Sequence, residues 1–87
     1  MSGRVEEQPA YVLHLRAYRD SSSIVELFSR DYGRVSVVAK GLKGSAKRRQ
    51  SWRSALQPGN LLTVSWLGRS ELKTLADVQL SSTFPLR

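Results

Sequence analysis

Alternation of apolar and polar residues predicts short β-strands along most of the chain. Apolar side chains recur at every second position in residues 34–40, 61–67 and 72–80, which is the spacing of a strand with one buried face. Residues 11–18 follow the same period, and residues 23–30 carry apolar side chains on both sides, as in a buried or bulged strand. We therefore expect five strands over these five ranges.

The same alternation predicts which side chains face the core. In the last strand, one face carries Leu72, Thr74, Ala76, Val78 and Leu80. The expected core takes alternate residues of the third and fourth strands and one aromatic residue from each of the first two. This set is Val35, Val37, Ala39, Leu62, Val64, Trp66, Tyr11 and Phe28.

The connections between these runs differ in length. Gly33 ends a tight turn at residues 31–33 and supplies a positive φ angle at little steric cost. The longest connection, residues 41–57, is rich in glycine, serine, lysine and arginine. It predicts a loop, with a short helix near residues 51–56.

Five short strands with the long connection after the third predict an all-β fold. They fit the five-stranded Greek-key barrel known as the OB-fold, with a long basic loop or short helix between strands three and four. An SH3-like barrel has a similar length and strand number and is the main alternative. We expect a flexible segment over residues 1–9 and the barrel over residues 10–82.

Composition limits the functions open to the chain. Its 87 residues support one small domain, and a mean hydropathy of −0.34 without a long apolar run predicts no membrane span. The N-terminus lacks the apolar segment of a secretory signal, so we expect a cytoplasmic location. With no cysteine and His14 as the single histidine, no metal site is expected. No phosphate-binding loop or catalytic triad is present, so we expect neither a cofactor nor an enzyme.

The net charge of +7 is distributed unevenly. Outside residues 32–70, six basic residues stand against seven acidic ones. Within that range there is no acidic residue, and the basic ones are Arg34, Lys40, Lys43, Lys47, Arg48, Arg49, Arg53 and Arg69. A one-signed surface attracts polyanions, so the pattern predicts contact with nucleic-acid phosphates.

Residues 40–53 are the strongest candidate for that contact, because lysine and arginine interspersed with glycine let a backbone approach phosphates. The alternative is a solvated loop whose charge maintains solubility. Trp52 could stack on an unpaired base or anchor the loop to the core. Arg16, Arg34 and Arg69 could form a phosphate track across the sheet, or be ordinary solvent-facing positions. Tyr18 is left undecided.

Several segments resemble the N-terminal domain of the bacterial recombination mediator RecO. They are YVLHLRAYRD at residues 11–20, SIVELFS at 23–29, GRV at 33–35, AKG at 39–41, LQPG at 56–59 and LKTL at 72–75. The resemblance covers about residues 9–87. It implies an OB-fold that binds single- and double-stranded DNA, anneals strands and helps to load recombinase. It also implies RecR and the single-strand-binding protein as partners.

The resemblance implies particular residues and a further domain. The family's basic contacts correspond to Arg34, to Lys40 in its Ala-Lys-Gly setting, to Lys43 and to the cluster that follows. Family members continue into a helical domain, so residues 83–87 are expected to begin a linker to it. A protein-interaction module whose basic loop docks on an acidic partner remains an alternative, and an RNA-binding barrel is a third.

Overall fold

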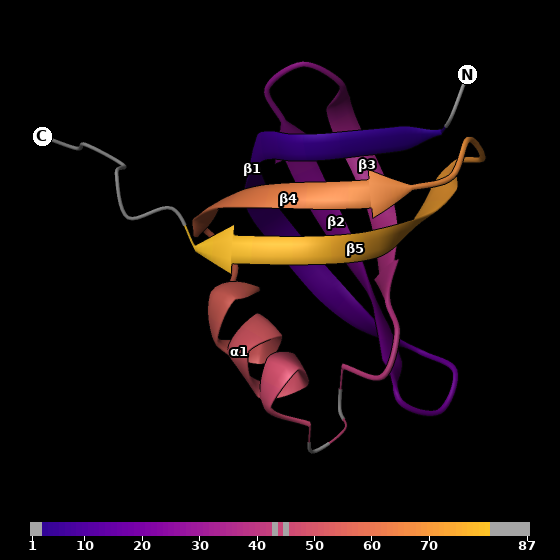
Figure 1. Ribbon diagram of the computed structural model, residues 1–87, viewed down its shortest axis with the longest axis vertical. Helices are drawn as coiled ribbons and strands as arrows, with labels where there is room; N and C mark the ends of the chain where they lie inside the picture. Colours follow the sequence, from indigo (N-terminus) through magenta and orange to yellow (C-terminus); the bar gives the residue numbers. More distant parts are fainter. Residues whose placement is uncertain (1–2, 43, 45, 81–87) are drawn as a thin grey trace, which may run out of the picture.

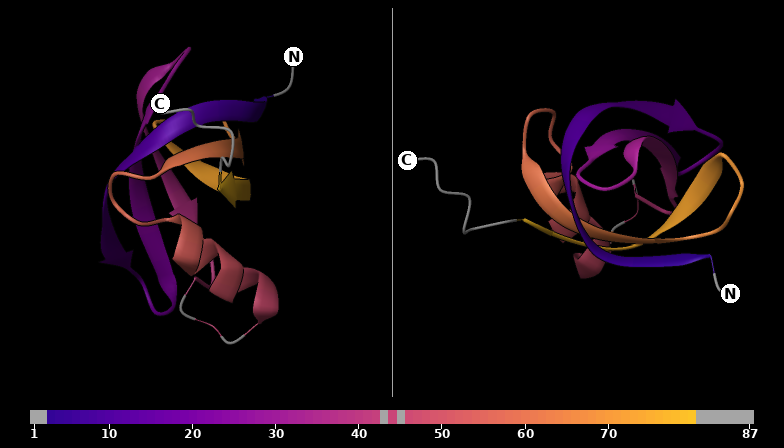
Figure 2. Two further views of the ribbon diagram at one scale, coloured as in Figure 1. Left: turned by 90° about the vertical axis from the view of Figure 1, so that its left-hand side faces the viewer. Right: turned by 90° about the horizontal axis from the view of Figure 1, so that it is seen from above.

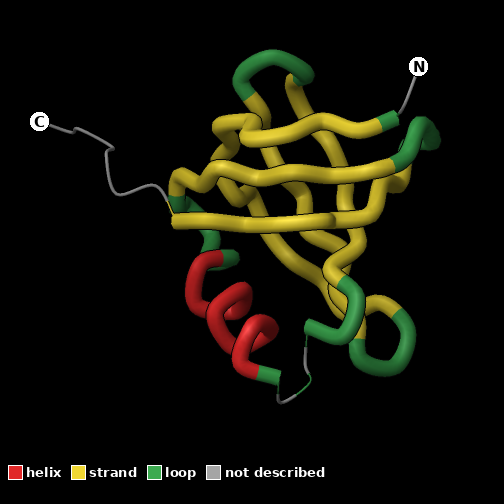
Figure 3. Tube along the Cα trace, viewed as in Figure 1, coloured by secondary structure: helices red, strands yellow, loops and turns green. Residues whose placement is uncertain are grey.

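The computed structural model describes residues 3–42, 44 and 46–80. Its secondary structure consists of five strands and one helix, which are coloured along the chain in Figure 1 and by type in Figure 3. In chain order they are β1 (Arg4–Tyr18), β2 (Ser22–Ser29), β3 (Gly33–Ala39), α1 (Lys47–Ala55), β4 (Leu61–Leu67) and β5 (Leu72–Leu80).

The strands form a closed barrel in the order β1-β2-β3-β5-β4, with β4 pairing back onto β1. All neighbours are antiparallel except β3 and β5, which run parallel. This topology, with α1 inserted between β3 and β4 at one end of the barrel (Figures 1 and 2), confirms the predicted OB-fold. In the described part of the chain, no helix is long and apolar enough to cross a membrane.

The first strand is longer than the sequence indicated, because it begins at Arg4 and not at residue 11. Its polar N-terminal half, which was assigned to a flexible segment, pairs with β4. The buried residue Gln8 helps to hold the N-terminal half of β1 in place. Its side-chain amide donates to the Asp31 carboxylate at 3.2 Å, and its side-chain oxygen accepts the Asp31 backbone N–H at 2.6 Å. The other strand boundaries agree with the prediction or differ by one residue.

A β-bulge at Leu13 reverses the predicted faces of β1. The register passes from Val12↔Leu27 to His14↔Glu26, which leaves Leu13 without a partner on β2. The prediction that Tyr11 and Phe28 belong to the core is therefore wrong. Tyr11 is 41% exposed and Phe28 is 53% exposed, because both point away from the barrel interior.

A bulge also interrupts the alternation of β5. Ser65 pairs with Asp77 and Trp66 with Leu75, so Ala76 is the extra residue. As a result the buried positions are Leu75 and Val78, which stand three residues apart, and the single face expected for this strand does not exist.

The barrel interior contains the side chains predicted from β3 and β4 together with one face of α1. The helix begins four residues earlier than expected and buries Trp52 and Ala55. Gly33 has the predicted positive φ, at 68°. The predicted core residues that are confirmed are Val35, Val37, Ala39, Leu62, Val64 and Trp66.

Candidate nucleic-acid interface

One candidate surface is the outer side of β2, β3 and the C-terminal half of β1, which lie behind β4 and β5 in Figure 1, whereas the N-terminal half of β1 runs beside β4. We call it the sheet face. The strand registers place three rows of outward residues side by side on it. These residues are Tyr11, Phe28 and Arg34 in one row, His14, Glu26 and Ser36 in the next, and Arg16, Ile24 and Val38 in the third.

Glu26 is the centre of an ion network on the sheet face. Its carboxylate accepts hydrogen bonds from Ser36 Oγ at 2.7 Å and from Arg16 Nη1 at 2.9 Å, and Arg34 Nε lies 3.8 Å away. The Glu26 side chain is only 7% exposed, whereas those of the two arginines are 54% and 64% exposed. The Ser36 hydrogen bond, followed by Arg16 and Arg34, lowers the Glu26 pKa although burial opposes this.

Arg16 and Arg34 therefore meet on one surface, as the predicted phosphate track required. Arg69 does not join them, because it lies in the turn between β4 and β5, where its side chain packs beside Gly3. The buried carboxylate neutralises one of the two guanidinium charges but leaves both groups more than half exposed.

An open groove of about 540 Å³ lies where the sheet face meets the turn between β1 and β2. Tyr18, Arg19, Val38, Lys40 and Thr74 are among its lining residues. Arg19 stands over the Tyr18 ring at 5.0 Å, and Lys40 is exposed at the end of β3. Sequence reasoning overlooked Arg19, although its position directly after an aromatic residue was a usable signal.

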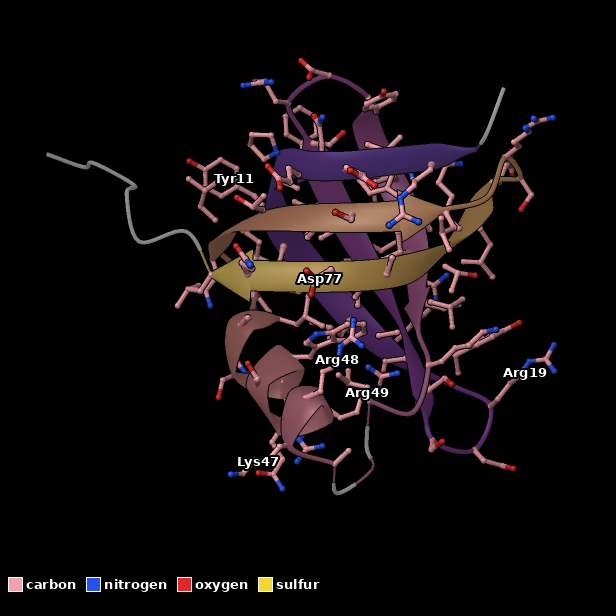
Figure 4. All side chains as sticks on the ribbon, in the orientation of Figure 1. Tyr11, Arg19, Lys47, Arg48, Arg49 and Asp77 are labelled. Carbon is pink, nitrogen blue, oxygen red and sulfur yellow. The ribbon has the colours of Figure 1, made fainter. Side chains whose placement is uncertain are left out.

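The first turn of α1 supplies three further cations: Lys47, Arg48 and Arg49. It contains no acidic residue, and Ala46 offers no side-chain cap. Cations at a helix N-terminus oppose the helix dipole, and no acidic residue of this turn offsets their charge. Figure 4 shows these three residues and Arg19 at the same end of the barrel. We call Arg19, Lys40, Lys47, Arg48 and Arg49 the basic end.

The two arginines of α1 also contact the barrel. Arg48 donates to the Ala76 carbonyl at 2.8 Å and lies 3.9 Å from Asp77, yet its side chain is 61% exposed. The guanidinium carbons of Arg48 and Arg49 stand 5.2 Å and 4.4 Å from the centre of the Trp52 ring. The sequence allowed Trp52 either to stack on a base or to anchor the loop to the core, and its burial shows the second. Trp52 is 3% exposed and offers no face to a base.

Arg53 has a structural task that the sequence did not reveal. Its Nη1 donates to the carbonyls of Leu42 at 2.6 Å and Gly44 at 2.7 Å, which holds the connection after β3 against the helix. This geometry gives the Arg53 guanidinium two backbone acceptors, and its expected contact with phosphates stays a prediction. Lys43, another predicted contact, lies outside the described residues.

No metal centre is formed by the residues that the structure describes, because no three histidine, cysteine, aspartate or glutamate side chains come together. His14 is exposed on the sheet face, next to Glu26 in the register.

Comparison with known proteins gives a consistent family. Residues 1–84 match the family described as "Recombination protein O N terminal". The DNA repair protein RecO of Halorhodospira halophila is 54% identical over 71 residues, which are 82% of this chain and 28% of that protein. RecO of Nitrosococcus oceani is 47% identical over 83 residues, covering 95% and 32%. RecO of Alkalilimnicola ehrlichii is 46% identical over 86 residues, covering 98% and 33%. The chain spans about a third of the length of these curated relatives.

Proposed function

This chain belongs to the family of RecO N-terminal domains, and from that premise we propose that it is a non-catalytic DNA-binding domain acting in recombinational repair. The observation that carries the proposal is the basic end. Four cations from α1 and the turn between β1 and β2 lie there with Lys40. Acidic residues near them include Asp20, next to Arg19 in the sequence, Asp77 beside Arg48, and Glu6 and Glu7, which line a hollow with Arg48.

Binding at such a surface is driven by phosphates. Each phosphate neutralised by a lysine or arginine releases condensed counterions, so affinity falls steeply with salt and depends little on base sequence. Both single and double strands present phosphates to the basic end. The exposed guanidinium groups of Arg16 and Arg34 extend the contact onto the sheet face.

Annealing follows from the same electrostatics. Cations that screen two strands from each other reduce their repulsion and leave the base edges free to pair. The family resemblance adds help in recombinase loading, a cytoplasmic location, and RecR and the single-strand-binding protein as partners of the whole protein. These finer assignments are part of the proposal.

An acidic protein segment is the second candidate ligand for the basic end. Guanidinium groups bind carboxylates as they bind phosphates, and Arg48 already faces the Asp77 carboxylate at 3.9 Å. A docking module of this kind would bind an acidic peptide, such as the tail of a single-strand-binding protein, and would ignore DNA.

A salt titration of binding to fluorescent single-stranded and duplex oligonucleotides tests the proposal. Lys40 and Lys47 are exposed, so the double variant Lys40→Ala/Lys47→Ala removes charge from the basic end with little effect on folding. Arg69→Ala/Lys73→Ala removes the same charge in and beside the turn between β4 and β5, on the opposite side of the barrel from α1 (Figure 1). If both lysines contact phosphates, the first variant lowers the magnitude of the salt slope by about 1.8 for duplex and about 1.4 for single strands, and the control keeps most of it.

Two results would overturn the proposal. One is a wild-type chain that binds neither oligonucleotide at low salt, and the other is an equal effect of the two double variants. Binding of an acidic peptide that the first variant loses, without any binding of DNA, would support the docking alternative. Stronger binding of a matched RNA than of DNA would indicate a role for 2′-hydroxyl contacts.

A further inference from the structure

Two aromatic side chains on the sheet face have no role in the core or at the basic end. Phe28 on β2 is 53% exposed, and Tyr11, its direct partner on β1, is 41% exposed. Exposing two neighbouring aromatic residues forgoes burial that would stabilise the fold. An adjacent exposed pair of this kind indicates a binding surface more than two scattered residues would.

The pair borders a hollow of about 240 Å³. Its other walls are almost entirely apolar and come from β1, the end of β2 and the beginning of β4. Pro9, Ala10 and Leu61 form these walls, and Arg30 stands at the edge. Tyr11 is labelled in Figure 4, where it lies on the outside of the barrel and away from α1.

Cationic groups surround the aromatic pair. Arg34 is the direct partner of Phe28 on β3 and is 64% exposed, and Arg30 is 67% exposed. Asp31 pairs with Arg30 at 3.1 Å, and Glu26 lies 3.8 Å from Arg34, but each carboxylate leaves most of the guanidinium surface in solvent. An apolar hollow edged by exposed guanidinium groups suits a ligand that combines flat apolar rings with negative charge.

We propose that Tyr11 and Phe28 form a stacking platform for the unpaired bases of a single-stranded nucleic acid. The inference rests on the proposed function and deepens it by naming where bases, as opposed to phosphates, are bound. Base–aromatic stacking tolerates every sequence because each base has a π face. Bases in a duplex are already stacked on each other, so the platform serves single strands only.

The platform is continuous with the basic end along β2. Phe28 and Ser22 are six residues apart on this strand, which corresponds to about 20 Å. A single strand can therefore place bases on Tyr11 and Phe28, pass phosphates over Arg34 and Arg16, and reach Tyr18 and Lys40 in the groove at the other end of the sheet face. An apolar protein segment would not need this cationic path.

Substitutions at Phe28 separate stacking from simple apolar contact. Phe28→Leu keeps an apolar side chain but removes the ring, whereas Phe28→Trp keeps a ring. Tyr11→Leu provides a second test at the other half of the platform. Tyr32→Leu is the matched control, since Tyr32 is an aromatic residue that is 56% exposed and lies outside the hollow.

The probes are an oligothymidine of about 12 nucleotides, within the site size of one OB-fold, and a duplex of the same length. We expect Phe28→Leu and Tyr11→Leu each to weaken oligothymidine binding about fivefold or more. Duplex binding should stay within about twofold of wild type. Phe28→Trp and Tyr32→Leu should bind both probes as the wild type does.

Other results overturn the inference. If Phe28→Leu and Tyr11→Leu bind oligothymidine like the wild type, or if they weaken both probes equally, no stacking platform exists. If an apolar peptide binds with the same affinity to wild type and Phe28→Leu while oligothymidine binding is unchanged, the hollow is a protein-docking site. A different result would contradict the proposed DNA-binding function, namely a wild-type chain that binds neither probe.

Discussion

Replacing Glu26 by glutamine tests the ion network of the sheet face. The substitution keeps the shape of the side chain and removes its charge. The carboxylate accepts hydrogen bonds from Ser36 at 2.7 Å and Arg16 at 2.9 Å, and a hydrogen bond to a charged group contributes about 1.5–3 kcal/mol. The hydrogen bond from Arg16 contributes at most about 1 kcal/mol because the Arg16 side chain is 54% exposed.

The expected loss can be summed from these parts. Glutamine can still accept the Ser36 hydrogen bond through a neutral oxygen, at about half the strength, so about 1 kcal/mol is lost there and about 1 kcal/mol at Arg16. The total of about 2 kcal/mol corresponds to a decrease in melting temperature of about 8–16 °C for a domain of this size. Urea unfolding at pH 7, followed by the fluorescence of the buried Trp52 and Trp66, measures the loss in the free energy of unfolding.

The pH dependence distinguishes the charge from the shape of the side chain. The Glu26 pKa is lowered from its ordinary value of 4.5, first by the Ser36 hydrogen bond. Stabilisation by the carboxylate is therefore complete above pH 4.5 and is lost as the pH falls through the lower pKa of the folded chain. The difference between wild type and Glu26→Gln should shrink progressively as the pH falls below 4.5. Equal stabilities at pH 7, or a difference that stays undiminished as the pH is lowered below 4.5, would refute the reasoning, and the exposed Glu71→Gln is the control.

Three further substitutions have defined outcomes in urea unfolding. Trp52→Ala should cost about 3–5 kcal/mol, a large part of the roughly 4–13 kcal/mol expected for a chain of this length, and a loss under 1 kcal/mol would contradict its place in the core. Arg53→Met should cost about 1–3 kcal/mol because the carbonyls of Leu42 and Gly44 lose their donor. Gly33→Ala should cost about 1–2 kcal/mol for its φ of 68°. Since nothing lies within 4 Å of the added carbon, a greater loss would point to an unseen clash.

The fold was predictable wherever a strand buries one face. In β4 burial follows the apolar alternation residue by residue, and in β3 the predicted core residues Val35, Val37 and Ala39 are buried, with Val38 buried as well. In β1 the bulge at Leu13, and in β5 the bulge at Ala76, shifts the later side chains to the opposite face. A bulge leaves no mark in the alternation itself, so the predicted faces failed in these two strands.

Charge alone predicts contacts at Lys40, Lys47 and Arg48, and these contacts stay a prediction. All three side chains are exposed, and Figure 4 shows Lys47 and Arg48 at one end of the barrel. The hydrogen bonds of the Arg53 guanidinium depend on two backbone carbonyls that meet it only in the folded chain. Phe28 was misassigned because β2 is apolar on both sides, and sequence cannot tell which side becomes the outer one.

The parallel pairing of β3 with β5 has a consequence for how the barrel assembles. It joins residues 36–38 to residues 72–74, so a stretch of more than thirty residues must be closed before these hydrogen bonds form. The hairpins β1-β2 and β2-β3 close over turns of three residues and incur much less entropy loss. This short edge of three residue pairs, like the pairing of residues 4–11 with residues 61–67, should therefore form after the hairpins. Backbone amides of residues 72–74 should exchange with deuterium before those of the β2-β3 hairpin.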